Sequence, residues 1–187
     1  MIAAFKWACG WLGCLLMAGA AAAFDLVPQT DFLNDSTRGV AQIQQDGGDN
    51  LAHIDQTVGT LDLNHNAHFA EIIQSGSGNS AYILQTGNLN LASVTQTGKN
   101  NYATTDQAGI GNTISVSQGG DYSTVTATQY GNLNSILVTQ PGGNLSRLTE
   151  IGNNNTIELH QTSGTPDKLN TYNITLTGNN MTMKVNQ

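Results

Sequence analysis

Hydrophobic and polar positions alternate in runs of seven residues from residue 39 onward, and through the middle of the chain the pattern restarts every 11 residues. Alternate residues of a β-strand point to the same face of its sheet. In the run Asn79–Gln85 one face would carry Asn79, Ala81, Ile83 and Gln85, while the opposite face is mostly polar. The pattern therefore predicts short strands whose inner face reads amide, apolar, apolar, amide.

Three residue types repeat in fixed columns, and each column is predicted to be structural. The glutamines that end the strand units are Gln45, Gln56, Gln74, Gln85, Gln96, Gln107, Gln118, Gln129, Gln140, Gln161 and Gln187. The asparagines that open the units are Asn50, Asn79, Asn90, Asn101, Asn112, Asn134, Asn144, Asn155 and Asn170. Glycines that permit the positive φ of a tight bend are Gly47, Gly76, Gly87, Gly98, Gly109, Gly120, Gly131, Gly142, Gly152 and Gly178.

With insertions allowed before residue 68 and around residues 164–168, the frame contains thirteen strand units. They end at residues 45, 56, 74, 85, 96, 107, 118, 129, 140, 150, 161, 176 and 187. Glu150 and Leu176 interrupt the glutamine column, and Met181 interrupts the asparagine column. A carboxylate at position 150 would break a ladder of amides.

A four-residue bend could close either as a hairpin within one sheet or as an arc between two facing sheets. The repeated inner amides favour the arc, because unit n then stacks on unit n+2 and equivalent side chains lie ~4.8 Å apart. An unpaired buried amide costs roughly 1–3 kcal/mol, whereas stacked amides satisfy each other. We predict an all-β fold, a β-solenoid of strand–arc–strand repeats with 11-residue half-units, 22-residue coils and two parallel in-register sheets. Both ends of the sheets are expected to be open, so that cross-β polymerisation can follow.

The first residues read as a targeting segment. Lys6 precedes the uncharged apolar run 7–17, and three alanines at 21–23 form a small-residue cleavage site. We predict a signal peptide at 1–23, a leader segment at 24–38 and the repeat domain at 39–187. A membrane anchor is the alternative, although the apolar run is short for one. Both cysteines, Cys9 and Cys14, lie in this segment, and lipidation of Cys14 stays open.

Charge and isolated polar residues narrow the functional classes. Without Lys6 the chain has 5 basic and 13 acidic residues, a net charge of −8, which argues against nucleic acid or anionic lipid as partner. Asp62, His65 and His68 could suggest a metal site, but substituted repeat residues are the preferred interpretation. We expect no catalytic residues, no cofactor, no metal and no small-molecule substrate. Acidic residues in bends and on outer faces are hypothesised to slow premature aggregation.

The motif Gln-x-Gly-x-x-Asn-x-Ala-x-x-x-Gln is intact at 45–56, 74–85 and 85–96, and it resembles the curlin repeat of curli fibre subunits. The resemblance extends over nearly all of residues 39–187. It implies a subunit that is exported unfolded across the outer membrane of a Gram-negative bacterium. There it would polymerise into extracellular cross-β fibres for adhesion and biofilm matrix. Its implied partners are further copies, other curlin subunits and the outer-membrane export machinery.

The resemblance leaves the subunit type open between the major subunit, which builds the fibre, and the minor subunit, which anchors and nucleates it. The segment 24–38 lacks a glycine-rich leader, and together with the start Phe24-Asp25-Leu26 this slightly favours the minor type. The C-terminal unit is not notably basic, which argues the other way. A different class of function also remains, a monomeric secreted solenoid that binds polysaccharide or ice through an outer face containing Thr124, Thr126 and Thr128.

Overall fold

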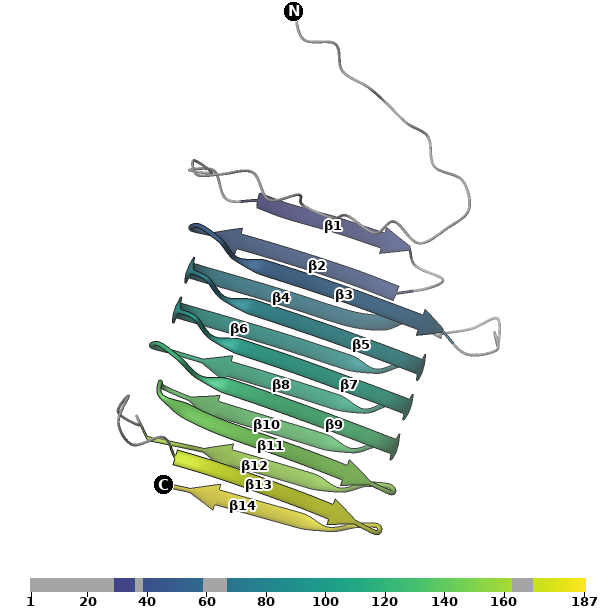
Figure 1. Ribbon diagram of the computed structural model, residues 1–187. Helices are drawn as coiled ribbons and strands as arrows, with labels where there is room; N and C mark the ends of the chain where they lie inside the picture. Colours follow the sequence, from purple (N-terminus) through teal and green to yellow (C-terminus); the bar gives the residue numbers. More distant parts are fainter. Residues whose placement is uncertain (1–28, 36–38, 59–66, 163–169) are drawn as a thin grey trace, which may run out of the picture.

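The computed structural model describes residues 29–35, 39–58, 67–162 and 170–187, and in these residues all regular structure is β-strand (Figure 1). The strands are β1 (Gln29–Asp35), β2 (Gly39–Asp46), β3 (Leu51–Val58), β4 (His68–Ser77), β5 (Ser80–Asn88), β6 (Leu91–Lys99), β7 (Tyr102–Ile110), β8 (Thr113–Gln118), β9 (Thr124–Asn132), β10 (Ser135–Gln140), β11 (Asn144–Ile151), β12 (Thr156–His160), β13 (Asn170–Thr177) and β14 (Thr182–Asn186). No helix long and apolar enough to cross a membrane occurs in these ranges. The predicted signal peptide lies outside the described residues.

Consecutive strands from β2 onward alternate between two sheets. One sheet, sheet A, has the order β1-β2-β4-β6-β8-β10-β12-β14, and the other, sheet B, has the order β13-β11-β9-β7-β5-β3. Except for the β1–β2 pair, neighbouring strands are parallel. Figure 1 shows the strands stacked as successive rungs from β1 at the top to β14 at the bottom. The predicted arc and two-sheet solenoid are therefore confirmed.

The strands stay in register although the bends differ in length. Gln74 pairs with Gln96, 22 residues later, as in most coils. The insertion before residue 68 lengthens the step to 29 residues, yet Gln45 still lies against Gln74. The short bend after Gln140 reduces it to 21 residues, and Gln129 lies against Glu150. Extra residues are thus accommodated in the bends, which leaves the side-chain columns intact.

The core is the narrow space between the two sheets, filled by two apolar columns from each sheet. Ala81 and Ile83 of β5 are 0% and 1% exposed, and the same alternation of buried and exposed residues recurs along the stack. In sheet A the first column changes from Ala70 and Ala92 to Ile114 and Ile136. Branched and small side chains suit a dry interface between closely packed sheets.

The arcs within the described ranges each contain two backbone positions that disfavour ordinary side chains. Gly76 has a φ of 113°, and a Cβ built there would lie 2.0 Å from the carbonyl oxygen of Gly98 in the next coil. Glycine is therefore required both by conformation and by the close approach of stacked arcs. Two residues further on, the chain is again left-handed, even at Leu89 and Leu133, whose φ values are 57° and 58°. The repeat pattern predicts the glycines, but it does not predict this second position.

The N-terminal end of sheet A is covered, which contradicts the expectation that both ends are open. Strand β1 pairs antiparallel with β2 over its whole length, with Leu33 opposite Ala41. It carries none of the repeat residues, so the periodic pattern contained no signal for it. The terminal strands of the stack are therefore β1 and β3 at one end and β13 and β14 at the other.

Candidate functional site: the buried amide ladders

Glutamine side chains of sheet A form a hydrogen-bonded ladder along the stack. The Nε2 group of Gln45 donates to Oε1 of Gln74 at 2.7 Å, and Gln74 donates in the same way to Gln96 at 2.8 Å. Gln96 continues the ladder to Gln118 at 2.8 Å. The Gln118–Gln140 step is longer, 3.5 Å, and Gln140 donates to Gln161. Every amide donates toward the C-terminal end of the stack, so the ladder has a direction.

Sheet B contains a second ladder of the same polarity. Gln56 donates to Gln85 at 2.9 Å, Gln85 to Gln107 at 2.9 Å, and Gln107 to Gln129 at 3.0 Å. Gln129 then donates to Oε2 of Glu150 at 2.8 Å. The glutamines from 74 to 140 are at most 1% exposed, so these bonds are made away from water.

In six of the ladder glutamines the second amide hydrogen crosses to the opposite sheet. Nε2 of Gln74 in sheet A donates to the backbone carbonyl of Leu51 in β3 at 3.0 Å, and Gln85 in sheet B donates to Phe69 in β4 at 3.0 Å. Gln56, Gln96, Gln107 and Gln118 make equivalent bonds at 3.0–3.2 Å. These six glutamines therefore join neighbouring coils and also hold the two sheets together. This bond is not predictable from the sequence, because no residue pattern marks its carbonyl acceptor.

The asparagine column bonds mainly to the backbone and not amide to amide. Oδ1 of Asn79 accepts the backbone N–H of Asn101 at 3.1 Å, while its Nδ2 donates to the carbonyl of Gly98 at 3.0 Å. The same pair of bonds recurs at Asn90, whose partners are Asn112 and Gly109. The asparagines therefore fix each arc onto the next one, and amide–amide bonds accompany this at Asn101 and Asn112.

His68 occupies an asparagine position of sheet A and takes over its function. Its Nδ1 accepts the backbone N–H of Asn90 at 3.2 Å, as an asparagine Oδ1 would, and Nε2 lies 3.3 Å from the carbonyl of Thr57. The side chain is 1% exposed, and burial lowers its pKa. Asp62 and His65 lie outside the described residues. Within the described ranges no three His, Cys, Asp or Glu side chains gather as a potential metal site.

Glu150 occupies a glutamine position and is fully buried. Loss of solvation raises its pKa from 4.5 to about 7, although the bond from Gln129 opposes the shift. Its Oε1 has no hydrogen-bond partner among the described residues, and Leu176 follows it in the column. The backbone N–H of Ile157 also opposes the shift, but less than the bond from Gln129 does. The sheet B ladder therefore ends at a buried carboxylate.

The last coils depart from the ladder in other ways. Ser146 takes the place of a small apolar residue after the shortened bend, and its hydroxyl accepts from Gln140 at 2.6 Å and donates to Gln161 at 2.9 Å. Nε2 of Gln161 is buried without a partner among the described residues. Gln187, expected in the ladder, instead accepts a bond from the Tyr172 hydroxyl. The sheet A ladder thus ends at Gln161 within one chain.

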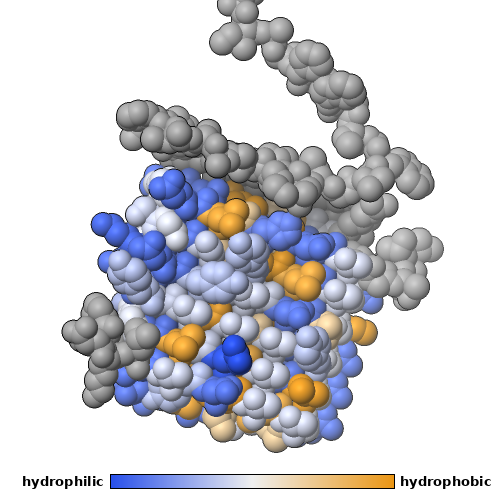
Figure 2. Space-filling view, in the orientation of Figure 1, coloured by the Kyte–Doolittle hydropathy of each residue, from blue (hydrophilic) through white to orange (hydrophobic). Residues whose placement is uncertain are grey.

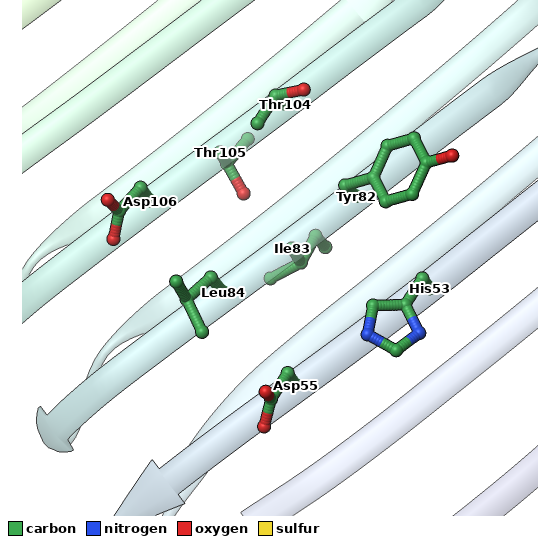
Figure 3. Close-up of a pocket in the computed structure, with 8 residues that line it drawn as sticks. All are labelled: His53, Asp55, Tyr82, Ile83, Leu84, Thr104, Thr105 and Asp106. Carbon is green, nitrogen blue, oxygen red and sulfur yellow. The ribbon is translucent and has the colours of Figure 1, made fainter. Parts of the chain in front are cut away.

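The outer face of sheet B carries a shallow hollow of about 320 Å³ (Figure 3). The rings of His53 and Tyr82 lie side by side, with centroids 6.4 Å apart. Asp55, Leu84 and Asp106 form one column, in which Leu84 lies between the two carboxylates. Figure 2 shows polar and apolar side chains interspersed on the visible face, without one continuous apolar patch. The face offers aromatic and carboxylate groups, but in an open hollow.

The arrangement can propagate, because it consists of identical bonds repeated along one axis. A further coil at the C-terminal end would meet the amide nitrogen of Gln187 in sheet A and the apolar side chain of Leu176 in sheet B. One at the N-terminal end would meet the acceptor oxygen of Gln56 in sheet B and, where β1 does not cover β2, that of Gln45 in sheet A. The donor at one end and the acceptors at the other are chemically complementary, as required for head-to-tail addition of like units.

A family model described as the curlin associated repeat matches residues 69–98 and 90–120. These residues, from β4 through the bend after β8, are thus similar to curlin repeats and include the most regular part of both ladders. No curated protein matches the chain, and no solved structure matches it.

Proposed function

We propose that this chain is a structural subunit of an extracellular, curli-type amyloid fibre. One observation carries the proposal: two directional ladders of buried glutamine amides run along the axis of an in-register parallel stack. The fibre would form when a second copy continues these ladders and the backbone pairing of the terminal strands. The match to the curlin associated repeat supports this reading.

The energetics favour addition over exposure of the edges. Terminal strands β13 and β14 present backbone groups that can pair with another strand. Each added backbone hydrogen bond contributes roughly 1 kcal/mol, and a new coil would also bury two apolar side chains from each of its strands. In-register stacking of identical amides and small apolar residues is the arrangement that stabilises amyloid.

The proposed location is the surface of a Gram-negative bacterium, reached by export through the signal peptide at 1–23. The chain from residue 24 onward has no cysteine and a low share of charged residues, and both features fit an exported chain that assembles without disulfides. Adhesion and biofilm matrix are the proposed roles of the fibre. Other curlin subunits and the export machinery are its proposed partners.

Assembly kinetics test the proposal directly. The chain is diluted from denaturant and followed by thioflavin fluorescence and sedimentation, with and without preformed seeds. Fibres that seed further growth are expected, whereas a chain that stays monomeric after seeding contradicts the proposal. Gln107→Leu should slow growth strongly, because it removes two steps of the ladder, those to Gln85 and Gln129, and leaves the donor of Gln85 unpaired. The matched control is Gln44→Leu, which changes a glutamine on the outer face of β2 and should grow at the parent rate.

The minor, nucleating type is the proposed subunit class, on the sequence of residues 24–38 and the regular spacing of the units. A substoichiometric amount of this chain should then shorten the lag of a major curlin subunit. An equal effect from any preformed amyloid seed of unrelated sequence would contradict the nucleator assignment while leaving the fibre subunit intact.

Binding of polysaccharide or ice is the alternative function, and one observation favours it. Thr128, Thr149 and Thr175 follow each other in register on the outer face of sheet B, which makes a regular row of hydroxyl groups. A monomeric chain that binds insoluble cellulose, or shapes growing ice crystals, would support this alternative. If Thr149→Val abolished that binding, the row of threonine hydroxyl groups would be the binding surface.

A further inference from the structure

We infer that successive copies in the fibre are related by a half-turn about the fibre axis, so that sheet A of one copy continues as sheet B of the next. The inference rests on the proposed fibre and concerns the surface through which two copies meet. It follows from the number of parallel strands and their stagger between the sheets.

In the part of the chain that the structure describes, the parallel stack contains an odd number of strands. Sheet A has eight strands, of which β1 is antiparallel, so seven parallel strands face the six of sheet B. Because consecutive strands alternate between the sheets, each lies about half a strand spacing, ~2.4 Å, further along the axis than the one before. The C-terminal end therefore exposes β13 in sheet B and, half a spacing later, β14 in sheet A.

A second copy added by translation alone does not fit this end. Its β2 would pair with β14, since both strands belong to sheet A. Its β3 would then lie two strand spacings from β13, ~9.6 Å and not the ~4.8 Å of a paired strand. Every joint would thus lack one strand in sheet B and leave backbone N–H and C=O groups unpaired on both sides of the gap.

A second copy rotated by a half-turn closes both sheets. Its β2 then follows β13 and its β3 follows β14, each at one strand spacing. In the apolar columns Ile43 would stack on Ile174, and Ile54 on Val185. The ladder also continues, because Gln187 would be followed by Gln56, which heads the sheet B ladder within its own chain. The Tyr172 hydroxyl occupies the carbonyl oxygen of Gln187 and not its amide nitrogen, the group that must donate to the next copy.

The joint also requires β1 to leave β2. If β1 of the incoming copy stayed on its β2, β1 would occupy the position beside β13 of the preceding copy that β2 needs. The incoming β3 would then lie one strand spacing too far from β14 of the preceding copy. Strand β1 therefore acts as a removable cover of the N-terminal edge. Its antiparallel direction makes it a poor continuation of a stack in which every other pair is parallel.

Two consequences distinguish the rotated fibre from a translated one. Each subunit advances thirteen half-spacings, ~31 Å, and the structure repeats only after two subunits, ~62 Å. Each side of the fibre also alternates between the outer faces of sheets A and B. The hollow beside Tyr82 would therefore occur on opposite sides of the fibre in successive subunits.

Electron cryo-microscopy of fibres grown from the full chain tests the inference. The expected result is a subunit rotation near 180°, apart from the gradual twist of the stack, with both sheets continuous across each joint. Subunits related by translation, or a missing strand in sheet B, would overturn it. A chain that forms no fibre would instead remove the proposed function, so the two failures are distinguishable.

Two variants sharpen the test. Deletion of residues 97–107 removes the single strand β7 and joins Gln96 to Ala108 with the motif intact. The resulting even number of strands should abolish the half-turn and shorten the rise to ~29 Å; a retained half-turn would overturn the inference.

Phe32→Cys with Gln42→Cys places a disulfide between paired positions of β1 and β2. The oxidised form should not grow from its N-terminal end until reduced, and equal growth before and after reduction would overturn the requirement that β1 leaves.

Discussion

Replacing Glu150 by glutamine should stabilise the solenoid, and the gain should depend on pH. The buried carboxyl has a pKa of about 7 against an ordinary value of 4.5. At about 1.4 kcal/mol per pH unit, this difference corresponds to ~3 kcal/mol of folding free energy. Because the folded-state pKa of Glu150 is raised, the contribution of its protonated form to the free energy of unfolding is fully present below pH 4.5. This contribution is lost as pH rises toward 7. The glutamine side chain does not ionise in this pH range, so the variant avoids this loss.

The magnitude also follows from the neighbours of Glu150. Protonated glutamic acid has nearly the shape of glutamine, and the oxygen of either side chain can accept the bond from Gln129. The two chains should therefore be about equally stable near pH 4. Near pH 8 the parent holds a fully buried carboxylate, so the variant should be ~3 kcal/mol more stable.

Urea unfolding followed by far-ultraviolet circular dichroism, at low protein concentration and several pH values, measures this difference. The contributions of other titrating groups cancel because parent and variant share them. Glu71→Gln changes a carboxylate on the outer face of β4 and serves as control; its effect should stay within ~0.5 kcal/mol at every pH. A gain from Glu150→Gln that does not change with pH, or a variant less stable at pH 8, would refute the reasoning.

Three further substitutions test other contacts. Gly76→Ala should unfold the surrounding arcs or lower the free energy of unfolding by more than ~3 kcal/mol, because its Cβ would lie 2.0 Å from a carbonyl oxygen. The control Gly48→Ala meets nothing within 4 Å and should be nearly neutral, and thermal unfolding compares the two. Thr105→Val should stabilise the fold by ~1 kcal/mol in urea unfolding, since the Thr105 hydroxyl is buried without a partner among the described residues, and destabilisation would show that the hydroxyl is bonded. His68→Asn should leave the melting temperature nearly unchanged at pH 8 and raise it at pH 5, because a lowered folded-state pKa means that stability present above pH 6.5 is lost as pH falls; an identical shift at both pH values contradicts this role.

The sequence predicts the fold well where one residue fixes one repeated contact. The spacing of Gln74, Gln85 and Gln96 predicts the strands, the arcs and the register, because period-2 alternation and a fixed bend length determine which side chains stack. The repeated inner amides favour an arc over a hairpin, and the structure shows the arc. Insertions did not disturb the prediction, since Gln45 still meets Gln74 across a longer bend.

The features that the sequence did not predict depend on geometry between elements. The bonds from glutamine side chains to opposite-sheet carbonyls need the distance between the sheets, which no spacing along the chain contains. Strand β1 has no repeat, and its place on β2 depends on an edge that is free for pairing. The left-handed conformation of Leu133 is imposed by the equivalent position in neighbouring arcs, although leucine itself disfavours it.

X-ray diffraction from aligned fibres of the chain tests the central claim most directly, because that claim is end-to-end continuation of the stack. The account predicts a sharp reflection at ~4.8 Å along the fibre axis and a broader one near ~10 Å perpendicular to it. Fibres whose ~4.8 Å reflection lies perpendicular to the axis would contradict the account, because solenoids would then be packed side by side without continuing one another's ladders.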